Sequence, residues 1–211
     1  MGYINSWLQE CGDKADNATG EAVAGWVAVG GDANTFVIAY GHRVTLQVRK
    51  DNIIELENTH SIINFVYRDD IYGRHGIIDA AGDGVKQEYD AEKGRRDENR
   101  DRRPLKSGAG NLPYKAIFHV LVTDELPIFS NNLHAALKFA DREGMRSIAI
   151  PGMTPSSDNQ KKIIDKYLEV LYEFEGRVQP SCLHLIDIVC SSGEDEDYHD
   201  KQMKKNTTMT R

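Results

Sequence analysis

Cysteine, long apolar runs and excess positive charge are all scarce in this chain of 211 residues. The three cysteines, Cys11, Cys182 and Cys190, include no C-x-x-C pair, and no cysteine or histidine pair has the spacing of zinc ligands. An odd number of unpaired cysteines is typical of reduced thiols inside a cell. We therefore expect reduced thiols, no metal site, and an intracellular protein of the cytoplasm or nucleus.

No apolar run approaches the roughly 20 residues that a membrane-spanning helix requires. The first residues, M-G-Y-I-N-S-W-L-Q-E, lack the basic and apolar regions of a signal peptide. The sequence thus predicts no membrane span. Gly2 and Ser6 fit the M-G-x-x-x-S pattern for N-myristoylation, but that pattern is short and common, and an ordinary initiator region is the preferred interpretation.

The formal net charge of -7 argues against nucleic-acid binding by the protein as a whole. Residues 93–106 nevertheless hold seven Lys or Arg, three Asp or Glu, and a single large apolar residue, Leu105. Because this segment buries too little apolar surface to offset the entropy of ordering it, we expect a mobile, solvated loop. The alternative is a contact for phosphate, nucleic acid or a protein partner; the interleaved acids and missing aromatics count against nucleic acid.

The clearest positive signal is a strand–helix–strand unit. The runs at 115–121 and 147–150 are apolar on both faces, as strands inside a parallel sheet are. A helix is expected between them at 131–143, with Ser130 as its N-cap. Ligands of such sheets bind beyond the carboxyl ends of the strands, so the functional site is expected there.

The other elements complete an α/β pattern. Further strands are expected at 25–29, 35–40, 43–48, 61–66 and 183–189, and further helices at 77–89 and 155–175. We expect a three-layer α/β/α sandwich with a mixed, mostly parallel central sheet, because the helices cover both faces and the first strands are joined by short turns. The expected domains are an N-terminal extension at 1–22, the folded domain at 23–190 and a disordered charged tail at 191–211.

Five segments, in order along the chain, are similar to the macro domain family, which binds ADP-ribose and related ADP-ribosyl groups. The similarity covers residues 42–190, and it implies the same macro-like sandwich. The segments are N-I-I-E-L-E from Asn52, S-I-I-N from Ser61, I-I-D-A-A-G from Ile77, S-G-A-G-N-L-P-Y-K-A-I-F-H-V from Ser107 and S-I-A-I-P from Ser147.

The resemblance also implies how ADP-ribose would lie. In the family, an aspartate that begins D-I accepts a hydrogen bond from the adenine amino group. Asn52 matches that residue, and its carbonyl is still an acceptor; Asp51 is adjacent. Asn64 matches the family's N-A-A-N segment and would lie near the distal ribose. The diphosphate would lie between two loops, whose implied ligand residues are Gly73, Arg74, His75, Gly76, Gly152, Ser156 and Ser157.

Both loops depart from the family pattern. The family's G-G-G-V is replaced by D-I-Y-G-R-H-G, and its S-T-G-I-Y-G-Y-P by G-M-T-P-S-S-D-N. Fewer glycines leave fewer backbone amides able to approach a diphosphate closely, and Pro155 has no amide hydrogen. The helix after Ser157 offers its N-terminus as a substitute.

The preferred hypothesis is a divergent macro domain that binds ADP-ribose, or an ADP-ribosylated or related nucleotide-bearing partner, without strong catalysis. The alternative is an interaction or scaffold module that has lost nucleotide binding. An ADP-ribosyl hydrolase fits least, because no residue set holds an attacking water, and no G-x-S-x-G, Walker or H-E-x-x-H motif is present. Asn64 has the alternative of a polar residue satisfied by the backbone. His119 is interpreted as a core histidine rather than a catalyst, and His75 faces the expected cleft.

Overall fold

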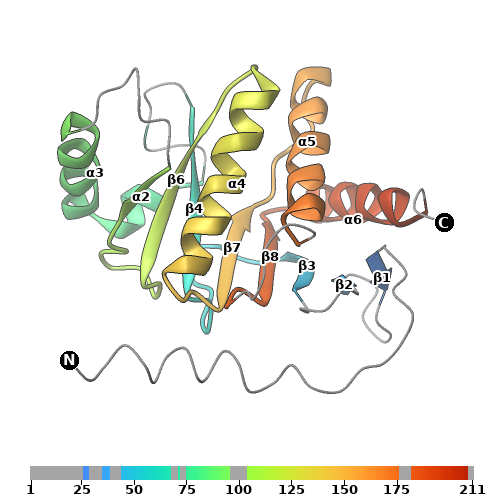
Figure 1. Ribbon diagram of the computed structural model, residues 1–211, viewed down its shortest axis with the longest axis horizontal. Coiled ribbons are helices and arrows are strands. Elements are labelled where there is room, and N and C mark those ends of the chain that lie inside the picture. Colours follow the sequence, from blue (N-terminus) through green and yellow to red (C-terminus); the bar gives the residue numbers. More distant parts are fainter. Residues whose placement is uncertain are drawn as a thin grey trace.

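The computed structural model describes residues 44–67, 71, 75–95, 104–175 and 182–208, with the backbone alone at 26–28, 35–38, 175 and 206–208. Within these residues, one eight-stranded sheet has the strand order β1-β2-β3-β8-β7-β4-β6-β5 (Figure 1). The strands are β1 (Trp26–Ala28), β2 (Thr35–Ile38), β3 (Thr45–Lys50), β4 (Ser61–Tyr67), β5 (Leu105–Ser107), β6 (Ala116–Val122), β7 (Ser147–Pro151) and β8 (Leu185–Cys190).

The five inner strands, from β3 to β6, are parallel, whereas β1, β2 and β5 pair antiparallel at the two edges. The register pairs Lys50 of β3 with Cys190 of β8, and Val189 of β8 with Pro151 of β7. The carboxyl ends of β3, β8 and β7 therefore finish level with one another. This mixed, mostly parallel sheet is the one predicted.

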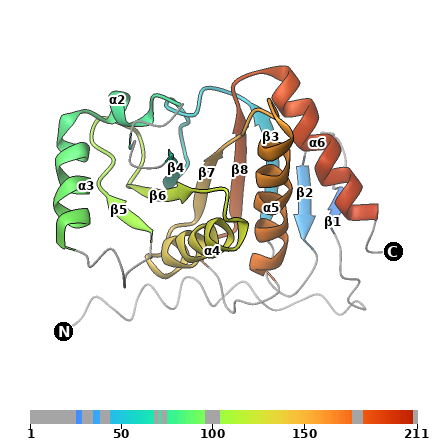
Figure 2. The ribbon, with the colours of Figure 1, turned by 90° about the horizontal axis from the view of Figure 1, so that it is seen from above.

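Helices cover both faces of the sheet. In Figure 2, α2 and α3 lie on one side of it and α4 and α5 on the other. This arrangement confirms the predicted α/β/α sandwich. The described helices are α2 (Ile77–Ala81), α3 (Asp83–Arg95), α4 (Leu126–Arg142), α5 (Asp158–Glu175) and α6 (Gly193–Thr208).

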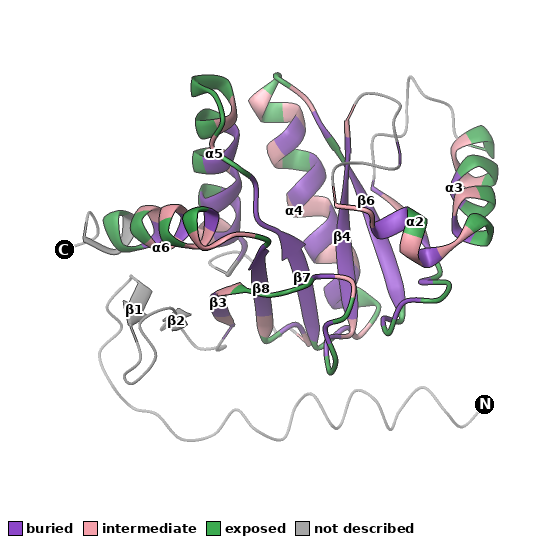
Figure 3. Ribbon diagram, turned by 180° about the vertical axis from the view of Figure 1, so that it is seen from behind, coloured by how far each residue is buried: buried purple, intermediate pink, exposed green. Residues whose placement is uncertain are grey.

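Two apolar cores form because the central strands alternate their side chains between the faces. Ile63 and Phe65 of β4 pack on the side of α4 and α5, whereas Ile62 packs on the side of α2 and α3. All residues of β4 except Tyr67 are buried, and β7 is buried throughout (Figure 3). Burial of both faces explains why these strands read as continuous apolar runs in the sequence.

Helix α4 begins at Leu126, five residues before the predicted start. Ser130 was expected to cap the helix but lies within it. Pro127 occupies the first turn, where its missing amide hydrogen costs no helical hydrogen bond. The extra turn buries Phe129 against Phe65, with 6.1 Å between the ring centroids.

The predicted disorder of the C-terminal tail is wrong, because residues 193–208 form α6. The capping signal was present in the sequence: the Ser192 hydroxyl accepts the amide of Asp195 at 3.1 Å. One turn of spacing then places His199 and Met203 on the same face, and both are buried against the sheet. The helix thus forms although its sequence has no sustained apolar period; Tyr198 also packs against the core.

The charged segment 93–106 is only partly described. Its first residues end α3, and Leu105 and Lys106 belong to the short edge strand β5, so the predicted loop is shorter at both ends. Residues 96–103 and the N-terminal extension at 1–22 lie outside the described residues. Cys182 and Cys190 are both free thiols. No helix in the described part of the chain is long and apolar enough to cross a membrane.

Candidate functional site

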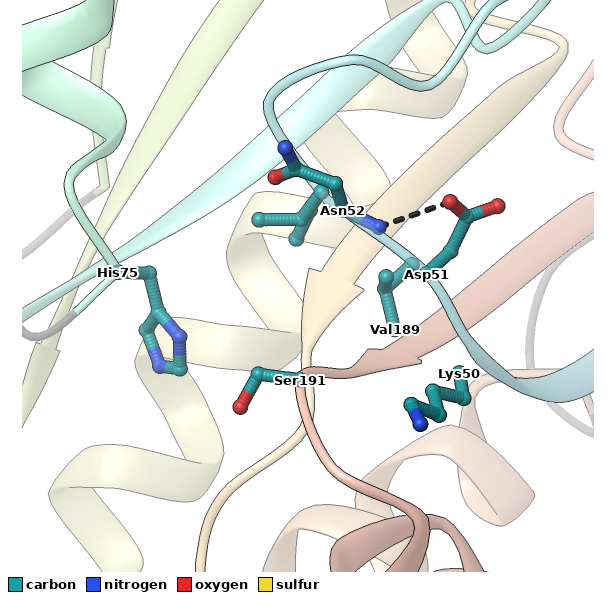
Figure 4. A pocket seen from close by; sticks show the side chains of 7 residues that line it. Lys50, Asp51, Asn52, His75, Val189 and Ser191 are labelled. Carbon is teal, nitrogen blue, oxygen red and sulfur yellow. Dashed lines mark hydrogen bonds between the residues drawn. The ribbon is translucent and has the colours of Figure 1, made fainter.

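A cavity of about 560 Å³ opens at the carboxyl edge of the sheet, where β3 and β8 end. It combines residues of three separate segments: the end of β3 and its following loop, the end of β8, and the segment before α2 (Figure 4). This is the edge at which open α/β sheets bind ligands. The lining residues are Lys50, Asp51, Asn52, Ile53, His75, Val189 and Ser191.

Backbone hydrogen bonds fix the loop after β3. The amide of Asp51 donates to the carbonyl of Cys190 at 3.1 Å, and this contact extends the pairing of β3 with β8 past the end of the strand. The buried Tyr114 hydroxyl, contributed by the segment before β6, donates to the carbonyl of Ile53. The backbone of this loop is thus held by hydrogen bonds at two positions along the wall of the cavity.

Asp51 is engaged within the protein. Its carboxylate accepts the amide of Asn52 at 2.8 Å and pairs with the guanidinium of Arg49. The Arg49 hydrogen bond and the Asn52 amide hold the pKa of Asp51 below its ordinary value. Asp51 therefore lines the cavity as an ionised carboxylate whose negative charge is compensated by Arg49.

Asn52 is exposed, and its side-chain carbonyl accepts the amide of Ile54 at a long 3.3 Å. A carbonyl oxygen has two lone pairs, so it retains capacity for a second donor. The backbone carbonyl of Asn52 accepts the amide of Glu55 at 3.1 Å, which closes the turn. Asn52 thus presents an amide on a fixed backbone.

Asn64 lies apart from this cavity. It is 1% exposed in β4, and its side-chain nitrogen donates to the carbonyl of Ile71 at 2.7 Å and faces Nδ1 of His119 at 3.3 Å. These internal contacts favour the alternative in which Asn64 is satisfied inside the fold. Its contact with a ribose stays a prediction.

The first predicted loop is described only in part, since Gly73 and Arg74 lie outside the described residues. His75 lines the cavity, as predicted for the cleft. Gly76 begins α2 with a left-handed φ of 63°, a conformation that favours glycine. Its carbonyl accepts the amide of Ala80 at 3.0 Å, so the residue serves to start the helix.

The second predicted loop does not line the cavity. The amide of Gly152 donates to the carbonyl of Val189 at 2.8 Å, and a Cβ on Gly152 would lie 2.5 Å from Sγ of Cys190. The amide of Ser156 donates to Thr154 at 2.8 Å, and the Ser157 hydroxyl caps α5 by accepting the amide of Gln160 at 3.2 Å. In this conformation these donors are used within the protein.

Solved macrodomain structures share this architecture. The Oceanobacillus iheyensis macrodomain with ADP matches with a TM-score of 0.60 at 17% identity, over 77% of this chain and 91% of that chain. A variant of that macrodomain with ADPR matches with a TM-score of 0.61 at 18% identity, over 77% of this chain and 93% of that chain. The Trypanosoma brucei macrodomain in complex with ADP-ribose matches with a TM-score of 0.59 at 14% identity, over 74% of this chain and 68% of that chain. This chain has a macrodomain fold. It matches no protein-family model and no curated protein.

Asp51, Asn52 and His75, all predicted site residues, line the cavity, as do Lys50 and Ser191, which were not predicted. Lys50 ends β3 and Ser191 directly follows β8, and the carboxyl end of a parallel strand is the position where ligand residues are expected. The signal was therefore present in the sequence. The family resemblance placed Asp51 and Asn52 at the end of β3 but assigned no role to Lys50, and no part of the site was predicted at the end of β8.

Asp187 is a further polar residue, and no motif in the sequence predicts a role for it. It is 2% exposed in β8, two residues before Val189 and on the same face of the sheet, and Oδ1 has no partner among the described residues. Burial raises the pKa of Asp187; the Arg49 charge opposes this rise and the Asp51 charge adds to it. The ionised carboxylate of Asp187 therefore lowers the stability of the fold, because it is buried with an oxygen that has no partner in the described part of the chain.

Replacing this buried carboxylate should stabilise the protein at neutral pH. A raised carboxyl pKa means that the folded state holds its proton more tightly, so stability is lost as pH rises. We expect Asp187→Asn to raise the melting temperature at pH 8 by at least about 2 °C and to have little effect near pH 4. Asp51→Asn is the matched control, and it should not stabilise, because the pKa of Asp51 is lowered. Scanning calorimetry at both pH values would measure the difference, and a loss of stability in Asp187→Asn at pH 8 would contradict it.

Proposed function

We propose that this macrodomain binds ADP-ribose, or an ADP-ribosylated partner, in the cavity at the ends of β3 and β8. The supporting observation is that Asp51, Asn52 and His75, which the family resemblance assigns to the ligand, line one cavity at the ligand-binding edge of the sheet. Solved structures of the same fold hold ADP, ADPR or ADP-ribose.

The cavity chemistry suits an adenine base. The side-chain carbonyl of Asn52 accepts from the exocyclic amino group, as the matching aspartate does in the family. Val189 and Ile53 are buried residues that supply apolar surface for the faces of the base. Asp51 remains paired with Arg49, so its charge does not repel the negatively charged diphosphate.

One observation favours the second candidate, an interaction module without nucleotide binding. The amides of Gly152 and Ser156 donate within the protein, and Met153 between them is buried with 4% exposure. Diphosphate binding by this loop would require those donors to be released. The loop geometry therefore makes direct measurement of binding the deciding experiment.

Titration with ADP-ribose tests the proposal. We expect the ligand at 100 times its dissociation constant to increase the free energy of unfolding by about 2.7 kcal/mol, since it binds only the folded state. Isothermal calorimetry gives the affinity, and thermal unfolding gives the stabilisation. No heat and no shift at millimolar ADP-ribose would leave the interaction module as the function.

Two substitutions of Asn52 separate ligand recognition from loop structure. Asn52→Ala removes the acceptor and should weaken ADP-ribose binding about tenfold. Asn52→Asp keeps an acceptor for the amide of Ile54 and provides a charged acceptor for the ligand. This variant should therefore bind ADP-ribose at least as tightly as the unmodified protein. Asn131→Ala, on exposed α4 surface, is the control for losing an asparagine elsewhere. Equal affinities in all four proteins would exclude Asn52 as the adenine contact.

A further inference from the structure

Hydrogen-bond donors gather on one side of the cavity. In Figure 4 the imidazole of His75, the hydroxyl of Ser191 and the ammonium of Lys50 lie on one side, whereas the Asn52 amide and the Asp51 carboxylate lie on the other. The three donors come from different segments, before α2, after β8 and at the end of β3. They line one cavity only because the tertiary fold brings these three segments together.

The charges on this side favour an anion. The carboxylate of Asp51 is the acidic group that lines the cavity, and its charge is matched by Arg49. Lys50 makes no ion pair in the part of the chain that the structure describes, so its charge is uncompensated. An ammonium with three donors, a hydroxyl and an imidazole are groups that bind phosphate oxygens.

The order of the strands shows which part of a bound nucleotide would meet these donors. Under the proposed function, the base lies at the end of β3 and the diphosphate lies toward the loop after β7. Strand β8 lies between β3 and β7, and neighbouring strands are about 4.8 Å apart. The ribose that joins base to diphosphate therefore lies over the end of β8, next to Ser191. Lys50 is on the far side of β8 from β7, which separates it from the diphosphate.

We propose that this cavity selects nucleotides with a phosphomonoester on the adenosine ribose, and that Lys50, Ser191 and His75 hold that phosphate. This inference rests on the proposed function, which supplies the position of the adenine base. It names a narrower ligand class: an adenosine nucleotide phosphorylated at the 2′ or 3′ hydroxyl. The charged contact with Lys50 supplies most of the preference.

Calorimetric titration with AMP, adenosine 2′,5′-bisphosphate, adenosine 3′,5′-bisphosphate, ADP-ribose and inorganic phosphate tests the proposal. We expect at least one bisphosphate to bind about tenfold more tightly than AMP, the gain of one charge-assisted phosphate contact. In Lys50→Gln this ratio should fall to about one. Lys162→Gln removes an exposed positive charge on α5, away from the cavity, and should keep the ratio.

The outcomes separate this inference from the proposed function. Tight ADP-ribose binding with equal affinities for AMP and both bisphosphates would overturn the phosphomonoester site and leave the proposed function standing. Equal weakening of AMP and bisphosphates by Lys50→Gln would assign Lys50 to the 5′-phosphate, and would also overturn it. Inorganic phosphate that binds as tightly as the bisphosphates would show a free-anion site instead. No binding of any probe would end both proposals.

Discussion

Acidification from pH 6.5 to pH 3 is expected to lower the free energy of unfolding by about 4 kcal/mol through His119 alone. His119 is 3% exposed in β6, and burial lowers its pKa from 6.5 to about 3. In the unfolded chain the imidazole takes up a proton below pH 6.5, whereas in the folded protein it resists until about pH 3. The unfolded state therefore binds more protons across that interval, and stability falls as the pH falls.

The hydrogen bonds around His119 require a neutral ring. The side-chain nitrogen of Asn64 donates to Nδ1 at 3.3 Å, so Nδ1 accepts; Nε2 then carries the proton and donates to the Ser107 hydroxyl at 2.9 Å. Ser107 in turn donates to the carbonyl of Gly108 at 3.0 Å. A second proton on Nδ1 would face the Asn64 amide nitrogen and lose that contact. Tyr89 covers the ring at 4.8 Å between centroids and excludes water.

Urea unfolding followed by circular dichroism between pH 3.5 and 8 would measure the effect. His119→Gln is the informative variant, because glutamine keeps an acceptor for Asn64 and a donor for Ser107 but does not titrate. Its stability should fall less steeply below pH 6.5 than that of the unmodified protein. The lowered pKa of His199 contributes to both curves and cancels in their difference. Parallel pH profiles for the two proteins would contradict the prediction.

Gly110→Ala is expected to destabilise the protein by about 3 kcal/mol, through backbone strain and overpacking together. Gly110 has a φ of 58°, and a Cβ there would lie 2.0 Å from the carbonyl oxygen of Ala81. That carbonyl accepts the amide of Asn111 at 3.0 Å, so moving it away from the new Cβ would break this hydrogen bond. The turn before β6 and helix α2 would have to separate.

Gly76→Ala separates the two causes. Gly76 has a similar φ of 63°, but a Cβ added there would have no atom within 4 Å of it. This substitution should cost only the strain of the left-handed conformation, about 1 kcal/mol. Chemical denaturation of both variants gives the comparison. Equal losses would mean that the contact with Ala81 relaxes freely, and that close packing of α2 on the turn contributes nothing.

Much of the fold was predictable because the central strands are buried on both faces. The apolar runs of β4, β6 and β7 indicate such strands directly, and the intervening amphipathic helices imply the sandwich. The prediction was wrong at the start of α4 and in the C-terminal tail. In both places short-range signals, Pro127 in a first turn and the Ser192 cap, combine with tertiary burial of Phe129 and Met203 that periodicity does not reveal.

The candidate site was predictable only in outline. Asn52 and His75 were expected at a cleft, and they line the cavity. The amides of Gly152 and Ser156 were expected to face a phosphate, yet they donate within the protein. The Gly152 amide is directed by a neighbouring strand, through the carbonyl of Val189 in β8, and the Ser156 amide by a turn onto Thr154 in its own loop; the loop sequence does not reveal the first of these contacts.

The sequence by itself determined the class of fold, since the pattern of apolar residues decides which segments are buried on two faces, on one, or on none. The tertiary structure decided the chemistry of the cavity. Lys50 and Ser191 line the same cavity only because β3 and β8, far apart in the chain, are neighbours that finish level in the sheet. Whether a segment is buried follows from its own residues. Which side chains line one cavity depends instead on strand order and register, which arise only when the whole sheet is assembled.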